Sequence, residues 1–331
     1  MDSEQPKSRA GSEAVDPDIA LLTEISALYY LEESTQEELS QKFGMSRARV
    51  GRLLRRAREL GIVDIRVQAP RTVQADLQRE FHSRFGLDRV LFALDQSDET
   101  AQRDTVAGLV ADYLNRSLAN GMIVAVGMGR NVGAVADNSF SPDRRKVVFV
   151  SAIGGSLKAG EYMNSDHISR RLAARFGGES ETLYAPALVA DPALRSALIA
   201  NDTVRQTLDR ARRADIALIG VGDVSENSNM VRMGWFTPQE IVEARLSGTV
   251  GDMMGYDFID IDGKPSNVAM QNRVIGLSTE DLHRIPDVIA IASESSKAAG
   301  ILGALRTGAI NTLATSVGNA RLVLQLDDAK R

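Results

Sequence analysis

One segment near the N-terminus, TQEELSQKFGMSRARVGRLLRRARELGIVDIRV, carries the start and stop signals of two short helices joined by a tight turn. Thr35 and Glu38 fit a capping box, in which each side chain accepts the backbone N–H of the other residue. We therefore expect a helix that begins near Gln36. Gly44 gives the backbone the freedom to turn sharply, and Ser46 can cap the next helix. The pattern predicts a helix-turn-helix.

At about one hundred degrees per residue, the helix after Ser46 separates into an apolar face and a basic face. The apolar face consists of Val50, Leu53, Leu54, Ala57 and Leu60. Small residues on the other face let the backbone enter a DNA major groove, and arginines there can reach guanine or phosphate oxygens. The residues predicted to contact DNA are Thr35, Gln36, Ser46, Arg47, Ala48, Arg49, Gly51, Arg52, Arg55 and Arg56.

Positive charge is concentrated in this segment. From Lys42 to Arg66 there are eight Lys or Arg residues against two acids, a local charge of +6 in a chain whose formal net charge is −5. A solvated basic surface helix would show the same charge run. Because caps, turn, spacing and charge agree, the segment favours binding of double-stranded operator DNA. Gly61 should end the helix, and Ile62 to Val67 alternates like a short strand, as in a wing.

The length of 331 residues exceeds that of one ordinary domain and fits a small DNA reader followed by a larger module. The predicted division is a disordered tail over residues 1–17, a helix-turn-helix domain over 18–68, a linker helix over 70–86 and an effector domain over 87–328. Val73, Leu77 and Phe81 form a narrow apolar stripe on the linker helix. This stripe would pack against the following domain or against a second copy, since such readers usually act as dimers.

Composition excludes several classes of protein. The chain has no cysteine, and its three histidines lack the spacing of metal ligands, so we expect no metal and no cofactor. No apolar run is long enough to span a membrane, and the N-terminal residues are too polar for a signal peptide. We expect a cytoplasmic protein without a membrane partner.

After Phe85, short apolar runs alternate with amphipathic helices. The runs are VLFAL, IVAVG, VVFVSAIGG, IALIGVGD, VIAIAS and TLATS, and helices are expected over residues 105–118 and 168–176. Most of these runs are continuously apolar, which is typical of parallel strands covered on both faces. The sequence therefore predicts an α/β effector domain with a doubly wound, mostly parallel sheet, in which ligands bind at the carboxyl ends of the strands.

Several loops carry residues that suit a polar, anionic or polyhydroxyl ligand. The candidates are Gly127, Gly129, Arg130 and Asn131 in the first loop, Gly154, Gly155 and Lys158 in the second, Asp223 in the third and Asp252 in the fourth. The glycines could equally serve close packing, and Asp252 could equally stabilise a turn after Gly251. The first loop lacks the full dinucleotide fingerprint, so no NAD is expected. Lys297 opens a helix, where it opposes the helix dipole, and either a ligand anion or a carboxylate such as Asp252 would offset that cost.

Taken together, these motifs resemble the SorC family of bacterial transcriptional regulators, also described as sugar-binding regulators of the DeoR/SorC type. The segments that carry the resemblance include ADIALIGVGD, GTVGDMMGYDFIDIDGKP and KAAGILGALRTGAINTLATS. The resemblance implies an effector domain similar to sugar-phosphate isomerases and glucosamine-phosphate deaminases, a homodimer or homotetramer, and control of a carbohydrate operon by a sugar, polyol or sugar phosphate. It also implies an effector pocket at the GMGRN turn, the glycine pair near Ser156, Asp252 and Lys297.

The chain departs from the family pattern at three places. Arg130 and Asn131 stand where the family often has threonine after the glycine, SESS replaces a glycine pair before Lys297, and residues 315–317 read Thr-Ser-Val instead of Thr-Asp-Glu. These differences speak against a phosphorylated effector and leave an unphosphorylated polyol open.

Two other classes of function are consistent with parts of the sequence. A sugar-phosphate isomerase or deaminase with a fused helix-turn-helix would need a positioned acid and base. Asp223, Asp252 and Glu294 could be proposed for those roles, yet no histidine accompanies them in a recognisable arrangement. Alternatively, the effector domain could be an oligomerisation scaffold that binds no ligand. We favour the regulator without enzymatic activity, and the sequence leaves open the operator, the effector's identity and whether transcription is repressed or activated.

Overall fold

The computed structural model describes residues 17–63, 65, 71–139, 141, 144–226, 228–255, 257–266 and 272–330. The chain forms two compact units, residues 1–67 and 68–331. Residues 1–16 of the expected disordered tail lie outside the described residues, whereas Pro17 is the first residue of a helix. No helix among the described residues combines the length and the apolar character needed to cross a membrane.

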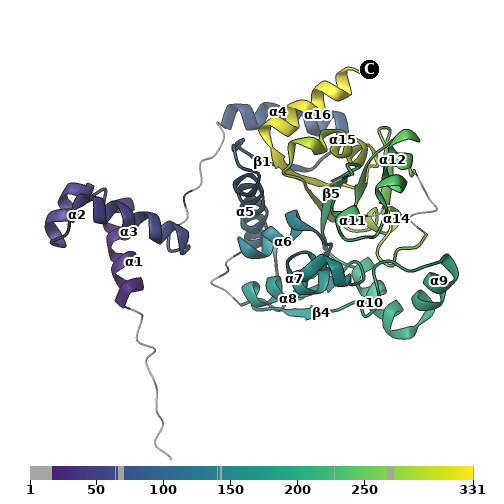
Figure 1. Ribbon diagram of the computed structural model, residues 1–331, viewed down its shortest axis with the longest axis horizontal. Coiled ribbons are helices and arrows are strands. Elements are labelled where there is room, and N and C mark those ends of the chain that lie inside the picture. The colour runs from purple at the N-terminus through teal and green to yellow at the C-terminus, as the bar shows by residue number, and fades with distance from the viewer. Residues whose placement is uncertain are drawn as a thin grey trace, which may run out of the picture. The chain divides into compact units, whose positions relative to one another are not determined.

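The smaller unit contains three helices, α1 (Pro17–Tyr30), α2 (Gln36–Lys42) and α3 (Arg47–Glu59) (Figure 1). The expected capping box is present, because Thr35 Oγ1 accepts the N–H of Glu38 at 3.2 Å and Glu38 Oε2 accepts the N–H of Thr35 at 2.8 Å. Ser46 Oγ accepts the N–H of Arg49 at 3.3 Å and so caps α3. The predicted starts of both helices are confirmed.

The buried side of α3 packs into a small apolar core. Val50 and Leu54 join Leu39 of α2 and Ile25 of α1 in this cluster. Leu60 was predicted on the same face but is 55% exposed, because α3 ends at Glu59 and the chain turns away at that point.

The expected wing falls largely on residues that the structure does not describe. Ile62 and Val63 lie in a turn after α3, whereas residues 64 and 66–67 lie outside the described part of the chain. Ile65 is described and does not belong to a strand either, so the prediction is wrong for Ile62, Val63 and Ile65 and untested for residues 64 and 66–67.

The larger unit is built on a sheet whose main path is parallel throughout. In spatial order the strands are β1 (Arg89–Ala93), β9 (Thr312–Ser316), β8 (Asp287–Ile291), β5 (Ile216–Asp223), β2 (Ile123–Val126), β3 (Val148–Ser151) and β4 (Glu179–Glu181). Each of the six apolar runs overlaps one of these strands, whereas the sequence pattern does not predict the short edge strand β4. The predicted α/β fold with a mostly parallel sheet is confirmed.

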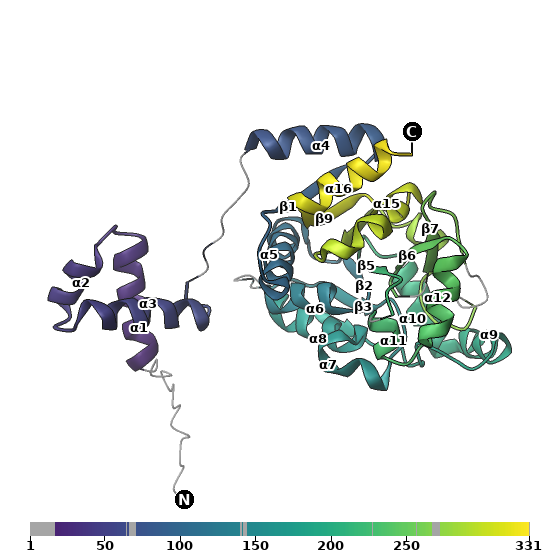
Figure 2. The same cartoon turned by 45° about the horizontal axis from the view of Figure 1, so that its top comes forward.

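Helices cover both faces of the sheet (Figure 2). One face packs against α5 (Glu99–Ser117), α6 (Arg130–Asp137) and α8 (Ser165–Phe176), and the other against α4 (Arg71–Phe85), α10 (Asp202–Arg212), α15 (Ala298–Arg306) and α16 (Val317–Asp328). In β5, Ile216 and Leu218 face one apolar core while Ala217 and Ile219 face the other. A strand buried on both sides gains from being apolar at every position, which explains the continuous runs.

An antiparallel hairpin extends the end of β5 and was not predicted. Its strands are β6 (Thr249–Met253) and β7 (Asp257–Asp260), and Asp252 pairs with Gly222 of β5. Asp252 therefore lies within a strand and not in the loop expected from the sequence. Glycines are needed here, since a Cβ atom on Gly222 would lie 2.0 Å from Asp252 Oδ2 and one on Gly300 would lie 2.6 Å from the carbonyl oxygen of Gly222.

Short helices complete the larger unit. They are α7 (Gly160–Met163), α9 (Pro192–Ala200), α11 (Asn229–Arg232), α12 (Pro238–Leu246) and α14 (Thr279–Leu282), with two 3-10 turns, η1 (Leu157–Ala159) and η2 (Ser295–Lys297). The helix expected from residue 105 begins earlier, at Glu99, because Asp98 caps it by accepting the N–H of Ala101 at 2.7 Å.

The helix expected as a linker, α4, packs on the larger unit through its second half. Leu77 is 7% exposed and Phe81 is fully buried, and the Phe81 ring lies 5.5 Å from that of Phe92 in β1. Arg84 forms an ion pair of 3.2 Å with Asp327 of α16. The apolar stripe was expected to pack either within the chain or against a second copy. Packing within the chain accounts for Leu77 and Phe81, whereas the side chain of Val73 lies outside the described residues.

We predict that Phe81→Ala lowers the free energy of unfolding of the larger unit by about 3–5 kcal/mol, because it leaves a cavity in a closed core. Leu322→Ala in α16, at a side chain that is 41% exposed, is the control and should cost far less. Trp235, the single tryptophan, is buried in the larger unit and can report its urea unfolding by fluorescence. Equal losses for the two variants would show that α4 does not belong to this core.

Candidate functional site

A cavity of about 250 Å³ opens at the carboxyl ends of β2, β5 and β8. The topology of the sheet explains this cavity. β2 and β5 are neighbouring strands, but the connection after β2 leads to β3 on one side, and the connection after β5 leads to β8 on the other side. Such a switch point leaves a crevice between the two outgoing connections. The cavity wall comes from the start of α6, the end of β5, α11, β6 with the turn after it, and η2.

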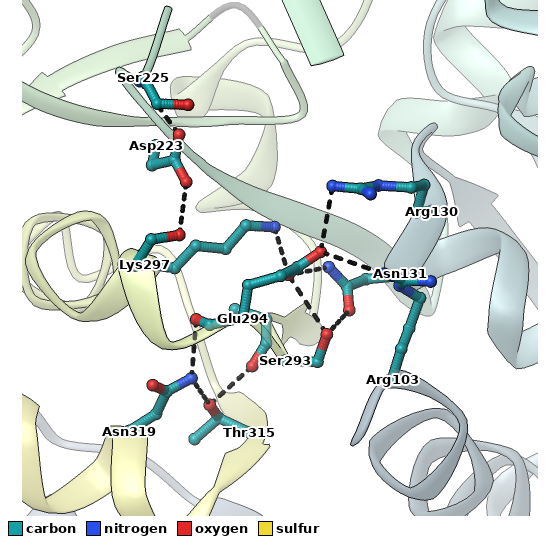
Figure 3. Close-up of polar contacts among 12 residues, drawn as sticks. Arg103, Arg130, Asn131, Asp223, Ser225, Ser293, Glu294, Lys297, Thr315 and Asn319 are labelled. Atoms are coloured by element: carbon teal, nitrogen blue, oxygen red, sulfur yellow. Dashed lines mark hydrogen bonds and ion pairs between the residues drawn. The ribbon is translucent and has the colours of Figure 1, made fainter. Parts of the chain in front are cut away.

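Glu294 lies at the centre of the polar contacts at one end of this cavity (Figure 3). Its carboxylate forms an ion pair with Lys297 Nζ at 2.8 Å and accepts a hydrogen bond from Asn131 Nδ2 at 2.9 Å. The guanidinium groups of Arg130 and Arg103 lie 3.5 and 3.8 Å from its other oxygen. One carboxylate is thus shared by groups from α5, α6 and η2.

Buried hydrogen bonds fix the backbone on which Glu294 sits. Ser293 Oγ donates to Asn131 Oδ1 at 2.7 Å, and Asn319 Nδ2 donates to the carbonyl oxygen of Glu294 at 3.1 Å. Asn319 also donates to Thr315 Oγ1 at 3.1 Å, and Thr315 Oγ1 donates to the carbonyl of Ala292 at 2.6 Å. Because Ser293, Asn319 and Thr315 are almost fully buried, the carboxylate is held in place before any ligand arrives.

The surroundings of Glu294 keep it ionised. Burial acts most strongly and raises the pKa, but the charge and hydrogen bond of Lys297 and the hydrogen bond from Asn131 together lower it to about 2. Lys297 is only 8% exposed and directly precedes α15, so it opposes the dipole of that helix. The sequence left a ligand anion or a carboxylate as the partner of Lys297. The structure shows a carboxylate, and the ion pair is formed by Glu294 and not by Asp252.

Asp252 forms a second acidic group in the cavity wall. Its side chain is 1% exposed, and Oδ1 accepts the N–H of Gly255 at 2.6 Å. Oδ2 has no hydrogen-bond partner among the described residues. Burial raises the pKa of Asp252 to about 7, against the opposing effects of the Gly255 hydrogen bond and the charge of Lys297. The neighbouring Met254 holds a φ of +60°, a left-handed conformation that is uncommon for a side chain of this kind.

The structure brings together part of the set of effector-binding residues expected from the sequence. The expected residues that line the cavity are Gly129, Arg130, Asn131, Asp223, Asp252 and Lys297. Asp223 is tied to η2, since Ser296 Oγ donates to its Oδ2 at 2.8 Å.

The remaining expected residues do not line this cavity. Gly127 packs against β5, where a Cβ atom would lie 2.8 Å from the carbonyl oxygen of Leu218, and Gly154 packs equally tightly against Ala185. Gly155 and Ser156 line a separate hollow, and Ser156 Oγ accepts a hydrogen bond from Trp235. Lys158 lies beside Gly234.

Sequence reasoning assigned no ligand role to several residues of the cavity. The sequence suggests Glu294 only as an acid or base of an enzyme. Its position directly after the VIAIAS run, at the end of a strand, is the signal that could have identified it as a cavity residue. Arg103 and Arg232 lie in segments without a motif, whereas Met254 lies in the GTVGDMMG segment, where only Asp252 was expected to bind a ligand. They approach the cavity through the packing of α5, α11 and the β6–β7 turn.

A second candidate site is the outer face of α3. Arg47, Ala48, Arg49, Arg52, Arg55 and Arg56 are exposed, whereas Val50, Leu54 and Ala57 on the opposite side are buried. Thr35 is exposed and Gln36 is half-buried at the start of α2, and Gln36 lies close to Gly51. None of these arginines forms an ion pair within the described part of the chain. The helix thus presents a row of cations that have no ionic partner among the residues described.

Comparison with known proteins identifies the family. The family model described as a putative sugar-binding domain matches residues 70–325. The solved sugar-binding domain of a transcriptional repressor from Vibrio fischeri is 52% identical, with a TM-score of 0.72, and the match covers 77% of this chain and 99% of that chain.

Two similar proteins extend over nearly the whole chain. The full-length sorbitol operon regulator SorC from Klebsiella pneumoniae is 27% identical, with a TM-score of 0.72, over 93% of this chain and 99% of that chain. The erythritol catabolism regulatory protein of Brucella abortus is 25% identical over 95% of this chain and 99% of its own. The chain belongs to the SorC family and is a sugar-binding transcriptional regulator.

Proposed function

We propose that the cavity at the ends of β2, β5 and β8 binds a sugar or polyol, and that this ligand controls the affinity of α3 for an operator. The observation that carries the proposal is a group of hydrogen-bond acceptors without a partner among the described residues. These acceptors are Asp252 Oδ2 and Ser228 Oγ, and both belong to residues that line the cavity. Glu294 Oε1 in the same wall accepts no hydrogen bond either, although Arg130 and Arg103 lie 3.5 and 3.8 Å from it. A polyhydroxyl ligand supplies several donors at once, and buried acceptors that lack donors cost free energy until they are paired.

The names of the relatives support a polyol in particular. One is named for a sorbitol operon and another for erythritol catabolism, and both compounds are open-chain polyols. The proposed effector for this chain is a compound of the same class, and the proposed target is an operon for its catabolism.

We further propose that α3 enters the major groove and that two copies of the chain act together. The outward arginines of α3 suit base edges and phosphates, with Arg52 near the middle of the exposed face. One recognition helix contacts only a few base pairs, so a dimer or a tetramer would provide the required specificity. The ligand would then change operator affinity only to the extent that it binds two arrangements of the assembly with different affinity.

We infer that the protein is not an enzyme. No histidine lines the cavity within the described residues, and Glu294 is held as an ionised carboxylate by its cationic neighbours. The raised pKa of Asp252 would suit a general acid or base, which is the feature that favours the rival function. Sustained turnover of sugar phosphates by the purified protein, absent from an Asp252→Asn variant, would establish that rival.

We predict that Arg52→Ala weakens binding to the operator and relaxes discrimination by about 1–3 kcal/mol, as expected for a bidentate base contact. Binding to operator and to scrambled DNA would be measured by fluorescence anisotropy at several salt concentrations. Arg205→Ala, at an exposed arginine of the larger unit, is the control and should change neither. An equal loss on both DNAs would assign Arg52 to a phosphate contact instead.

We predict that Asp252→Asn changes how stability depends on pH. The native pKa of Asp252 lies near 7 and above its ordinary value of 3.8, so the native state holds a proton that the unfolded chain has lost. The wild type should therefore lose stability as pH rises from about 4 to about 7, and the variant should lose less. Urea unfolding followed by Trp235 fluorescence measures this. Asp202→Asn, at an exposed site, should keep the wild-type slope, and an unchanged slope in Asp252→Asn would contradict the prediction.

A further inference from the structure

The cations near the start of α6 already surround a carboxylate of the chain itself. Glu294 is paired with Lys297 at 2.8 Å, and Arg130 and Arg103 lie 3.5 and 3.8 Å from it. Asn131, in the first turn of α6, donates its amide to the same group at 2.9 Å. Free cations beside a helix N-terminus would form an anion site, but here the anion is part of the protein.

We infer that Glu294 occupies the position where a phosphate group would otherwise bind, so that the cavity takes an unphosphorylated polyol or sugar and excludes its phosphate ester. This inference rests on the proposed function and specifies the chemical class of the ligand. A phosphate entering beside Glu294 meets a like charge in a poorly hydrated site, and finds Lys297 and Asn131 already engaged.

The rest of the cavity fits hydroxyl groups better than a second anion. The charged residues that line it are the acids Glu99, Asp223, Asp252 and Glu294 and the bases Arg130, Arg232 and Lys297. Asp252 Oδ2 is almost fully buried and has no hydrogen-bond partner among the residues described, which suits the O–H donor of an alcohol. Of the three bases, Lys297 and Arg130 are paired with Glu294. Arg232 is exposed to solvent, which screens its charge.

The first experiment measures ligand preference with the full-length chain. Erythritol, ribitol, sorbitol, ribose and glucose, each with its terminal phosphate ester, are tested by isothermal titration calorimetry and thermal melting. At least one neutral compound should bind at least about tenfold more tightly than its own ester. Tighter binding of the ester would overturn this inference and leave the proposed function intact. Binding of neither class would overturn the ligand-controlled regulator, and this inference with it.

The second experiment removes the internal anion. Glu294→Ala should melt at a lower temperature than the wild type in chloride and recover in inorganic phosphate of equal pH and ionic strength, because phosphate fills the vacated position. The wild type and the control Glu226→Ala, at an exposed carboxylate outside the cavity, should show no such gain. Absence of phosphate rescue in Glu294→Ala would contradict the assignment.

A variant of the same shape keeps the test decisive if Glu294→Ala does not fold. Glu294→Gln retains the size of the side chain and removes its charge, so the preference for a neutral compound over its ester should shrink at least about threefold, because the like-charge repulsion is lost. A preference equal to that of the wild type would show that the charge of Glu294 does not exclude phosphate.

Discussion

The ion pair between Glu294 and Lys297 is the contact on which the geometry of the cavity depends. Neither charge could remain buried alone, because an unpaired ion in a poorly hydrated site costs several kcal/mol. The pair draws Asn131 and Arg130 of α6 and Arg103 of α5 toward η2, and so joins the connections that leave β2 and β8. The polar end of the cavity is therefore assembled in the absence of ligand, which reduces the ordering that binding must supply.

Backbone packing sets the opposite wall. Gly222 in β5, Gly251 in β6 and Gly300 in α15 approach so closely that a side chain on any of them would collide with a neighbour. This close approach places Asp252 opposite the end of β5 and buries its carboxyl group, which raises its pKa. The cavity thus combines one carboxylate kept ionised by cations with one carboxyl group that burial drives toward its neutral form, two groups with different hydrogen-bonding capacity.

In this sugar-binding regulator of the SorC family, the cavity and the exposed arginines belong to different units. The described cavity is formed by residues 99–297 of the larger unit, whereas the exposed arginines belong to α3 of the smaller one. A ligand changes the affinity of a protein for DNA only if it binds two states of that protein with different affinity. In the larger unit, α4 packs on β1 through Phe81 and Phe92, and α4 is the first helix of that unit in the chain.

The sequence by itself determined the elements whose signals are local. The capping box at Thr35, the cap at Ser46, the two faces of α3 and the continuous apolar runs of the parallel strands each depend on neighbouring residues, and the structure contains all of them. It also pointed to Gly129, Arg130, Asn131, Asp252 and Lys297, which line the cavity, because ligands in such folds gather at strand ends. The pairing of Glu294 with Lys297 joins residues three positions apart, a spacing that the sequence already offers. Only the tertiary structure decided that Arg103 approaches the same carboxylate from α5, and that Gly155 and Ser156 line a different hollow. These relations join residues up to about two hundred positions apart, and side-chain packing between distant elements leaves no periodic trace in the chain.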